Sequence, residues 1–186
     1  SYFPSNSITK YWNIIVFRSK YLNSILRNKC RKISIVLTDV DCVLTDGGMY
    51  YTENGDIMKK FHTRDGMGVS LLRRKKIPTI IITKEKTKFV KKWAKKMNVE
   101  KLYDGIEKKE DLVTTICSKY DVTLQELAYI GDDINDLELL KKVGLSVTPA
   151  DGITDAKKIC NYICKSKGGE GAFRELADLI LQTRVK

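Results

Sequence analysis

Apolar and polar residues follow one another along this chain in blocks that predict strands and helices in turn. Four short apolar runs are typical of buried strands, at 33–38, 79–82, 127–130 and 144–147. Apolar positions recur at helical spacing in the stretches between and after them, roughly 66–75, 86–97, 109–120, 134–142 and 172–182. Strands that alternate with helices form parallel βαβ units. The pattern therefore predicts an α/β fold built on a central parallel sheet.

One segment, residues 48–61, departs from this alternation. Met49 to Thr52 and Ile57 to Phe61 look like two short strands, and Asn54-Gly55 lies between them. An Asn-Gly pair between two such runs is a strong signal for a tight turn. We therefore expect a β-hairpin after the first strand of the sheet.

The first strand ends in two carboxylates, Asp39 and Asp41. Alternate residues of an extended chain share a face, so both can address one ligand. A second apolar run also ends in acids, Asp132, Asp133 and Asp136. Either cluster alone could be an ordinary strand-end turn. Because the ligand crevice of such sheets lies at the carboxyl ends of the strands, the two together predict a Mg²⁺ site.

Two further strand ends lie between these acidic clusters. Thr83 follows the run at 79–82, and Leu102-Tyr103 leads to Lys108 and Lys109. An aspartate, a hydroxyl, a lysine and a second aspartate, in this order, are typical of phosphoryl transfer through an aspartate.

With these four motifs the chain resembles the haloacid dehalogenase superfamily of phosphohydrolases over residues 33 to about 182. Segments 44–51, 64–68 and 168–175 resemble one branch of it. That branch comprises small phosphatases of 3-deoxy-2-keto sugar acids, namely 3-deoxy-manno-octulosonate 8-phosphate and the sialic-acid-like nonulosonate 9-phosphates. The resemblance implies a Rossmannoid three-layer sandwich with a protruding hairpin and no cap domain. A related domain is fused to some acylneuraminate cytidylyltransferases, so a phosphatase-like oligomerisation module is the alternative function.

The resemblance also implies a role for each motif residue. Asp39 matches the nucleophile that forms an aspartyl phosphate, and Asp41 the general acid and base. Thr83 and Lys109 match the groups that bind the transferring phosphoryl oxygens. Lys108 is a rival for the lysine role. The Mg²⁺ ligands would be Asp39, the backbone carbonyl of Asp41, and Asp132, while Asp133 and Asp136 would support them.

Candidate substrate contacts carried over from the branch are Arg64, Glu85, Lys96, Gly169 and Arg174. Lys84-Glu85-Lys86-Thr87 and Glu170 look more like the nine-carbon phosphatases, whereas Arg64-Asp65-Gly66 looks more like the eight-carbon ones. We therefore expect a keto sugar-acid phosphate as substrate and favour nine carbons over eight.

Neither interval between the motifs has room for a cap, so the site would be open to water. A neighbouring subunit could close it, and the resemblance implies a homotetramer built through the hairpin. Its aromatic side chains Tyr50, Tyr51 and Phe61 are the expected contacts. The alternative is that they pack on their own domain.

Residues 1–32 lie outside the resemblance and form a basic amphipathic extension before a phosphatase domain at 33–186. Such a helix can rest on a membrane surface, but packing on its own protein is the favoured interpretation. Its apolar run, 14–17, is too short for a signal peptide, and no segment is long enough to span a bilayer.

Composition changes this picture little. The chain has 34 Lys and Arg residues against 23 Asp and Glu residues, which gives a formal charge of +11. Such a charge raises the question whether the protein binds nucleic acid. The densest lysine run, at 84–96, lacks the interleaved aromatics of a polynucleotide groove, so no nucleic acid is expected.

Five cysteines without a framework spacing indicate reduced thiols in a cytoplasmic protein. Cys42 stands where the family usually has glycine, and we expect a buried, inert thiol there.

Overall fold

The computed structural model describes residues 24–184 and contains one parallel sheet. Its strands are β1 (Ile35–Thr38), β4 (Thr79–Ile82), β5 (Lys101–Tyr103), β6 (Leu127–Ile130), β7 (Leu145–Thr148) and β8 (Tyr162–Ile163). They lie in the order β5-β4-β1-β6-β7-β8, with every neighbouring pair parallel. The two acid-tipped strands, β1 and β6, are therefore adjacent at the centre of the sheet.

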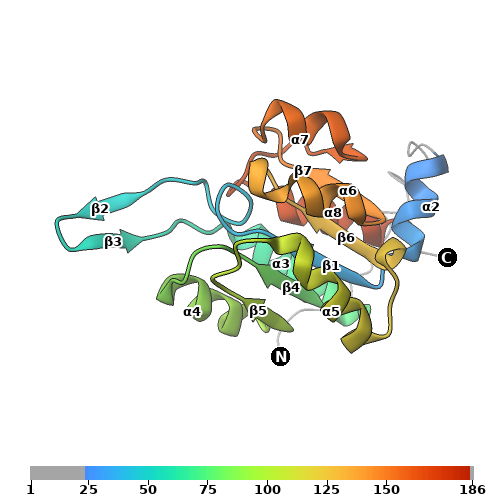
Figure 1. The fold of residues 1–186 in the computed structure, drawn as a ribbon, viewed down its shortest axis with the longest axis horizontal. Helices are drawn as coiled ribbons and strands as arrows, with labels where there is room; N and C mark the ends of the chain where they lie inside the picture. Colours follow the sequence, from blue (N-terminus) through green and yellow to red (C-terminus); the bar gives the residue numbers. More distant parts are fainter. Residues whose placement is uncertain (1–23, 185–186) are drawn as a thin grey trace, which may run out of the picture.

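Helices cover both faces of the sheet (Figure 1). Their bounds are α2 (Ser24–Lys32), α3 (Thr63–Arg74), α4 (Lys88–Met97), α5 (Leu112–Tyr120), α6 (Leu137–Lys142), α7 (Thr154–Ile159) and α8 (Ala172–Leu181). Alternate strand residues serve different faces: Val36 joins the hydrophobic cluster under α3, α4 and α8, whereas Ile35 and Leu37 join the cluster under α5, α6 and α7. This is the predicted three-layer sandwich.

The predicted hairpin is present as β2 (Tyr50–Thr52) and β3 (Gly55–Met58), and it projects from the body of the protein (Figure 1). Between β1 and β4 the chain forms only this hairpin and α3, and between β4 and β6 it forms only α4, β5, α5 and short 3₁₀ turns. Neither interval contains a cap domain.

Several element boundaries differ from the predictions. Helix α3 begins at Thr63 rather than at 66, because the His62 side chain accepts a hydrogen bond from the Arg64 N–H and so caps the helix. The helices expected at 109 and 134 open instead as 3₁₀ turns, η1 (Lys109–Asp111) and η3 (Ile134–Asp136). The strand β8 and the helix α7, of two and six residues, were not predicted.

Only the last nine residues of the N-terminal extension, helix α2, lie within the described residues. Cys30 of α2 is buried in the core cluster, where Leu26 also packs. The Lys29 ammonium donates to the Gly144 carbonyl at 2.7 Å. This part of the extension is therefore docked on its own domain, whereas the aromatic residues before it fall outside the described residues. Among residues 24–184, no helix is long and apolar enough to cross a membrane.

The closest packing of helices, between α3 and α8, includes a buried carboxylate, Asp65. Its Oδ1 accepts the backbone N–H of Arg174 at 2.8 Å in the first turn of α8, while Oδ2 has no partner among the described residues. Burial raises the pKa of Asp65 to about 6, although the Arg174 N–H and side chain act in the opposite direction.

We expect this carboxylate to make stability fall with pH. Because the pKa of Asp65 is higher in the folded protein, the native state binds the proton more tightly, and this advantage is lost as the pH rises from about 4 through about 6. The loss is on the order of 3 kcal/mol. Urea unfolding at pH 4.5 and pH 7 should show a smaller loss of stability in Asp65→Asn than in the wild type, because the raised pKa values of Asp39 and Asp132 contribute to the loss in both proteins. Equal pH slopes for the two proteins would contradict the assignment.

Candidate active site and metal centre

The nucleophile candidate, Asp39, is the first residue after β1. Its N–H donates to the Ile130 carbonyl of β6 at 3.0 Å, and its Oδ1 accepts the Val40 N–H at 2.7 Å. The N–H groups of Leu44 and Thr45 both return to the Val40 carbonyl, at 2.8 and 3.0 Å. The chain therefore leaves the sheet in a tight, hydrogen-bonded loop that holds the Asp39 carboxylate at the carboxyl edge.

A fully buried lysine, Lys109, lies against this carboxylate. Its Nζ is 2.8 Å from Asp39 Oδ2 and 2.7 Å from Asp136 Oδ1, and it donates to the Tyr129 hydroxyl at 3.3 Å. Two carboxylates keep the pKa of Lys109 above its ordinary value although burial acts against the charge. Lys108, the rival in the sequence, is exposed. The structure thus places Lys109, and not Lys108, against the Asp39 carboxylate.

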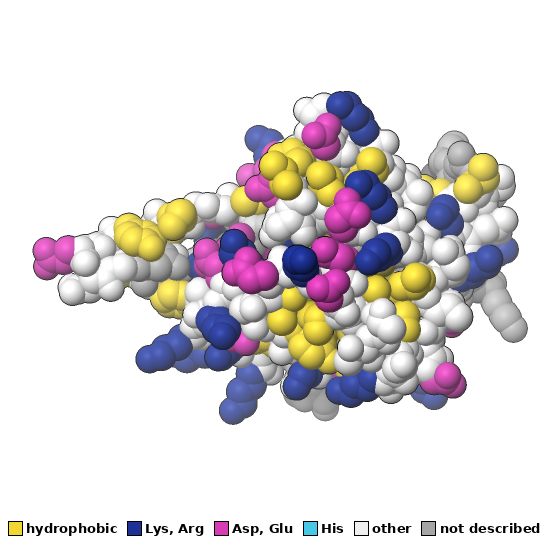
Figure 2. Space-filling model, viewed as in Figure 1, with side chains coloured by type: hydrophobic (Ala, Val, Ile, Leu, Met, Phe, Trp, Pro, Cys, Tyr) yellow, Lys and Arg dark blue, Asp and Glu magenta, His cyan; other side chains and the backbone are white. Residues whose placement is uncertain are grey.

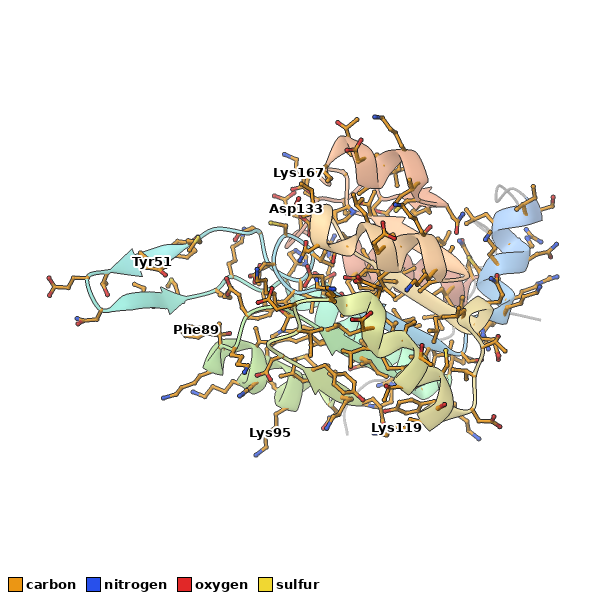
Figure 3. All side chains as sticks on the ribbon, in the orientation of Figure 1. Tyr51, Phe89, Lys95, Lys119, Asp133 and Lys167 are labelled. Atoms are coloured by element: carbon orange, nitrogen blue, oxygen red, sulfur yellow. The ribbon has the colours of Figure 1, made fainter. Side chains whose placement is uncertain are left out.

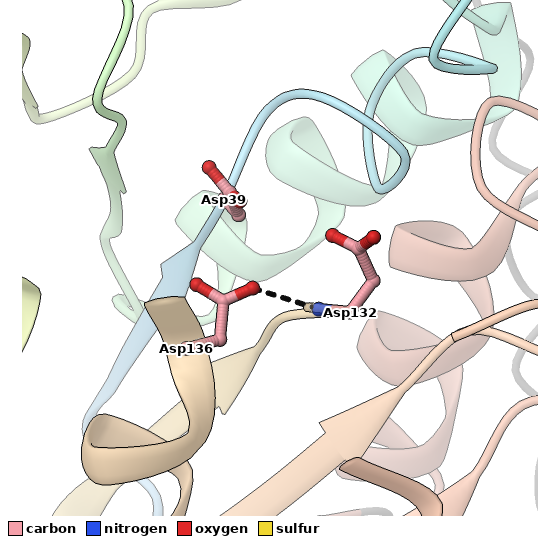
Figure 4. A group of neighbouring side chains, drawn as sticks. All are labelled: Asp39, Asp132 and Asp136. Carbon is pink, nitrogen blue, oxygen red and sulfur yellow. Dashed lines mark hydrogen bonds between the residues drawn. The ribbon is translucent and has the colours of Figure 1, made fainter. Parts of the chain in front are cut away.

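Asp136 connects the two acid-tipped strands. Its Oδ1 accepts the Tyr129 hydroxyl at 2.5 Å as well as Lys109, and its Oδ2 accepts the backbone N–H groups of Asp132 and Asp133 at 2.8 and 3.2 Å. Figure 4 shows the bond to Asp132. Both oxygens of Asp136 are therefore engaged by protein donors. These contacts indicate that Asp136 stabilises the turn after β6 rather than binding a ligand directly.

Asp39, Asp132 and Asp136 offer carboxylate oxygens within 4.8 Å of one another (Figure 4). Burial, followed by repulsion from Asp136 and Asp39, raises the pKa of Asp132 to about 8. Burial also raises the pKa of Asp39 to about 7, since it outweighs the attraction of Lys109. A cluster of buried oxygen donors with excess negative charge fits a hard divalent cation. The predicted metal ligands Asp39 and Asp132 are both in it.

We expect a divalent cation to stabilise the protein through this cluster. At free Mg²⁺ about 100 times its dissociation constant, the unfolding free energy should rise by about 2.7 kcal/mol. Because the raised pKa values of Asp39 and Asp132 let protons compete for the site, the thermal shift should be larger at pH 8 than at pH 6. Differential scanning calorimetry of Asp132→Asn should show no Mg²⁺ response. The matched variant Asp133→Asn, in an exposed residue outside the cluster, should keep it; the opposite pattern would contradict the site.

Asp41, the candidate acid and base, lies outside the three-carboxylate cluster and is partly exposed. Its Oδ1 accepts the Thr45 hydroxyl at 3.2 Å and the Lys59 ammonium at 2.6 Å. The same ammonium is 2.7 Å from Glu85 Oε2. Lys59 therefore joins two predicted site residues that are 44 positions apart in the chain.

The remaining predicted residues differ in where the structure places them. Thr83 follows β4, next to β1 in the sheet, and is buried. Gly169 packs on the loop that follows β1, residues 39–46, which we call the catalytic loop because it carries the candidates Asp39 and Asp41. The Gly169 N–H donates to the Val43 carbonyl at 3.0 Å. Arg64 and Lys96 are exposed, and among residues 24–184 neither side chain has an ion pair with a site carboxylate. Arg174 pairs with Asp178 within α8 at 2.8 Å. One chain thus brings together Asp39, Lys109 and Asp132, and links Glu85 to Asp41 through Lys59, whereas Arg64, Lys96 and Arg174 pair with none of these carboxylates among residues 24–184.

Cys42 has a backbone conformation that accounts for the glycine usually found at this position in the superfamily that the sequence resembles. Its φ is +59°, in the left-handed region that glycine adopts without a steric penalty. Burial, followed by the nearby charges of Asp132 and Asp41, raises the pKa of Cys42 to about 12. The thiol therefore stays protonated at neutral pH and is a poor nucleophile. Cys42 is partly exposed, however, so the expectation of a buried thiol at this position is wrong.

The sequence analysis missed two contacts with candidate site residues, those of Lys59 and Tyr129. Tyr129 faces the Lys109 side of β6, and its position in an apolar strand looked like an ordinary core residue. Lys59 follows the hairpin at a site where an exposed lysine is common. Neither carried a local signal, because each acts on residues distant in the chain.

Comparison with known proteins decides which family builds such a site. The family model of the haloacid dehalogenase-like hydrolases matches residues 69–176, more than half of the chain. The chain belongs to this family. It is 34% identical over 161 residues to 3-deoxy-D-manno-octulosonate 8-phosphate phosphatase KdsC from Haemophilus influenzae, covering 87% of this chain and 89% of that protein.

Solved structures of the family agree. The 3-deoxy-D-manno-octulosonate 8-phosphate phosphatase from Yersinia pestis superposes with a TM-score of 0.85 at 32% identity, covering 88% of each chain. The Moraxella catarrhalis enzyme, solved in complex with a magnesium ion, a phosphate ion and KDO, gives a TM-score of 0.82 at 30% identity, covering 85% of this chain and 91% of that one. The predictions of a haloacid dehalogenase fold and a phosphoric monoester hydrolase are confirmed. The acidic cluster of Asp39, Asp132 and Asp136 agrees with the predicted Mg²⁺ site, and the Moraxella catarrhalis relative was solved with a magnesium ion.

Proposed function

We propose that this haloacid dehalogenase-like hydrolase is a Mg²⁺-dependent phosphatase of a phosphorylated 3-deoxy-2-keto sugar acid. The observation that supports this most strongly is Asp39, which lies between a buried ammonium at 2.8 Å and a second carboxylate, Asp132, in one cluster. A nucleophile with a cation on one side and a metal-binding acid on the other is what transfer of a dianionic phosphoryl group requires.

The proposed reaction has two halves. A carboxylate oxygen of Asp39 attacks phosphorus while Asp41 gives a proton to the departing sugar oxygen. Asp41 then takes a proton from the water that hydrolyses the aspartyl phosphate. Thr83 and Lys109 hold the phosphoryl oxygens in both halves. Asp39, Asp132 and the Asp41 carbonyl would hold Mg²⁺, which offsets negative charge on the phosphoryl group.

The chain length of the sugar is part of the proposal. The relatives named above are eight-carbon phosphatases, which supports 3-deoxy-D-manno-octulosonate 8-phosphate. Residues 84–87 resemble the nine-carbon branch, and Lys59 bridges Glu85 to Asp41, the residue proposed to protonate the leaving sugar oxygen. We therefore expect a nonulosonate 9-phosphate to be the better substrate and the octulosonate the second.

Phosphate release from both compounds, with Mg²⁺ and with EDTA, tests the proposal. The expected result is Mg²⁺-dependent release from at least one of them, with the higher kcat/KM for the nine-carbon compound. Release that persists in EDTA would contradict the metal assignment. Inertness toward both would favour the alternative, a phosphatase-like module that serves oligomerisation.

We also propose that a neighbouring subunit completes the site in a homotetramer. Large apolar side chains are exposed along the hairpin, among them Met49, Tyr51 and Ile57 (Figure 2). Figure 3 shows Tyr51 on the hairpin, away from the helices, and Lys95 directed outward from α4. An apolar arm of this kind is suited to a protein contact. Light scattering of the wild type and of Tyr51→Glu tests it, and a monomeric wild type would rule it out.

A further inference from the structure

The base of the hairpin carries a lysine whose surroundings differ from those of its neighbours. Lys59 directly follows β3, and its side chain is only 8% exposed although it lies at the edge of an open site. Its ammonium bridges Asp41 Oδ1 at 2.6 Å and Glu85 Oε2 at 2.7 Å. The side chains of Asp41 and Glu85 are more exposed, at 32% and 49%. Charge-assisted hydrogen bonds of this length fix the geometry of their partners.

The bridge acts on one particular oxygen of Asp41. Oδ1 accepts from both Lys59 and Thr45, whereas Oδ2 has no hydrogen bond from another residue in the described range 24–184. A carboxyl group that gives a proton to a leaving oxygen must present one oxygen to it and have the other fixed. The arrangement therefore fixes Oδ1 and leaves Oδ2 for the reacting group.

The position of Lys59 is itself set by contacts on both sides of the hairpin base. Phe61 forms a β-bridge with Thr45 in the catalytic loop. Its ring also stacks on Trp93 of α4, with centroids 5.0 Å apart and planes at 13°. The chain segment that carries Lys59 is thus held between α4 and the catalytic loop, which contains Asp41.

We propose that Lys59 is the positioning residue of the acid and base Asp41, and that the hairpin base delivers it. The inference rests on the phosphatase function proposed above. In the first half reaction a bond forms between Asp39 and phosphorus, the bond from phosphorus to the sugar oxygen breaks, and the proton on Asp41 Oδ2 goes to that oxygen. Lys59 contacts neither phosphorus nor the departing oxygen. Its role is to keep Asp41 Oδ2 directed at the departing sugar oxygen.

A comparison of leaving groups tests this role. An alkyl phosphate needs the proton from Asp41, whereas the p-nitrophenolate of p-nitrophenyl phosphate leaves without one. In Lys59→Met, kcat/KM for the sugar-acid phosphate should fall about 100-fold, while kcat/KM for p-nitrophenyl phosphate, which reports only the first half reaction, stays near the wild-type value. Because water activation also needs Asp41, a burst of p-nitrophenolate should precede slow turnover.

Lys60→Met is the matched control, since Lys60 is the next residue, is 54% exposed and pairs with Asp46 at 3.3 Å. It should leave both kcat/KM values unchanged. Equal losses for the two substrates in Lys59→Met, or no loss for either, would overturn the proposal. Failure of the phosphatase function would appear separately, as a wild type that hydrolyses neither compound.

A crystal structure of Lys59→Met provides a measurement that does not depend on turnover. The Asp41 carboxylate should leave its wild-type position, while Asp39, Lys109 and Asp136 keep theirs. An Asp41 carboxylate that stays in place without the ammonium would show that Lys59 does not position it.

Discussion

Asp39→Asn should abolish phosphate release, with a loss on the order of 10⁴-fold or more. The amide has nearly the shape of the carboxylate but cannot attack phosphorus, so no covalent intermediate can form. Steady-state assays with Mg²⁺ give the loss, and acid quenching during turnover should trap phosphorylated wild type but no phosphorylated variant.

The same substitution should not unfold the protein. It removes one charge from a buried cluster in which burial raises the pKa of Asp39 to about 7, so the folded state tolerates an uncharged group there. Urea unfolding should show a free energy equal to or above the wild-type value in the absence of Mg²⁺. Turnover that survives in a folded Asp39→Asn protein would disprove the nucleophile assignment.

Lys109→Met should damage both the fold and the reaction. The substitution leaves Asp39 and Asp136 buried without the cation that lies within 2.8 Å of both. Removing one partner of a buried ion pair costs about 3 to 5 kcal/mol. Loss of a preorganised charge at the phosphoryl group should also reduce kcat by about 10² to 10³.

Lys108→Met provides the control for Lys109→Met, because Lys108 is exposed and precedes it directly in the chain. Urea unfolding and phosphate release should both match the wild type. A Lys108 variant that loses activity while Lys109→Met keeps it would reverse the choice between the two lysines.

The sequence predicted the central parts of the site because each lies at the end of a strand. Asp39 directly follows β1, and Thr83 directly follows β4. Asp132 follows β6 after one glycine. Because these strands are parallel, their pairing alone brings the three side chains to one edge of the sheet. The choice of Lys109 over Lys108 could not be made in this way. It depends on the 3₁₀ turn η1, at whose start Lys109 is buried while the preceding residue, Lys108, is exposed.

Contacts made across the chain could not be predicted from the sequence. Lys59 reaches Asp41 and Glu85 only because the hairpin returns to its own base, and nothing in the local pattern distinguishes it from Lys60. The boundaries of α3 depended on a histidine cap, a less common choice than serine or aspartate. The fold class needed none of these details, because hydrophobic periodicity and strand order determine it.

The approach of Gly168 to the catalytic loop also constrains when this protein becomes active during synthesis. A side chain at Gly168 would place its Cβ 1.8 Å from the Cys42 carbonyl oxygen, and the Gly169 N–H binds Val43. The loop that holds Asp39 and Asp41 is thus held by residues more than 120 positions later in the chain. Such a long-range contact forms only after the entropy of closing that loop has been overcome. A nascent chain that ends before residue 168 would carry every catalytic side chain named here and still lack the packing that holds the nucleophile and the acid together.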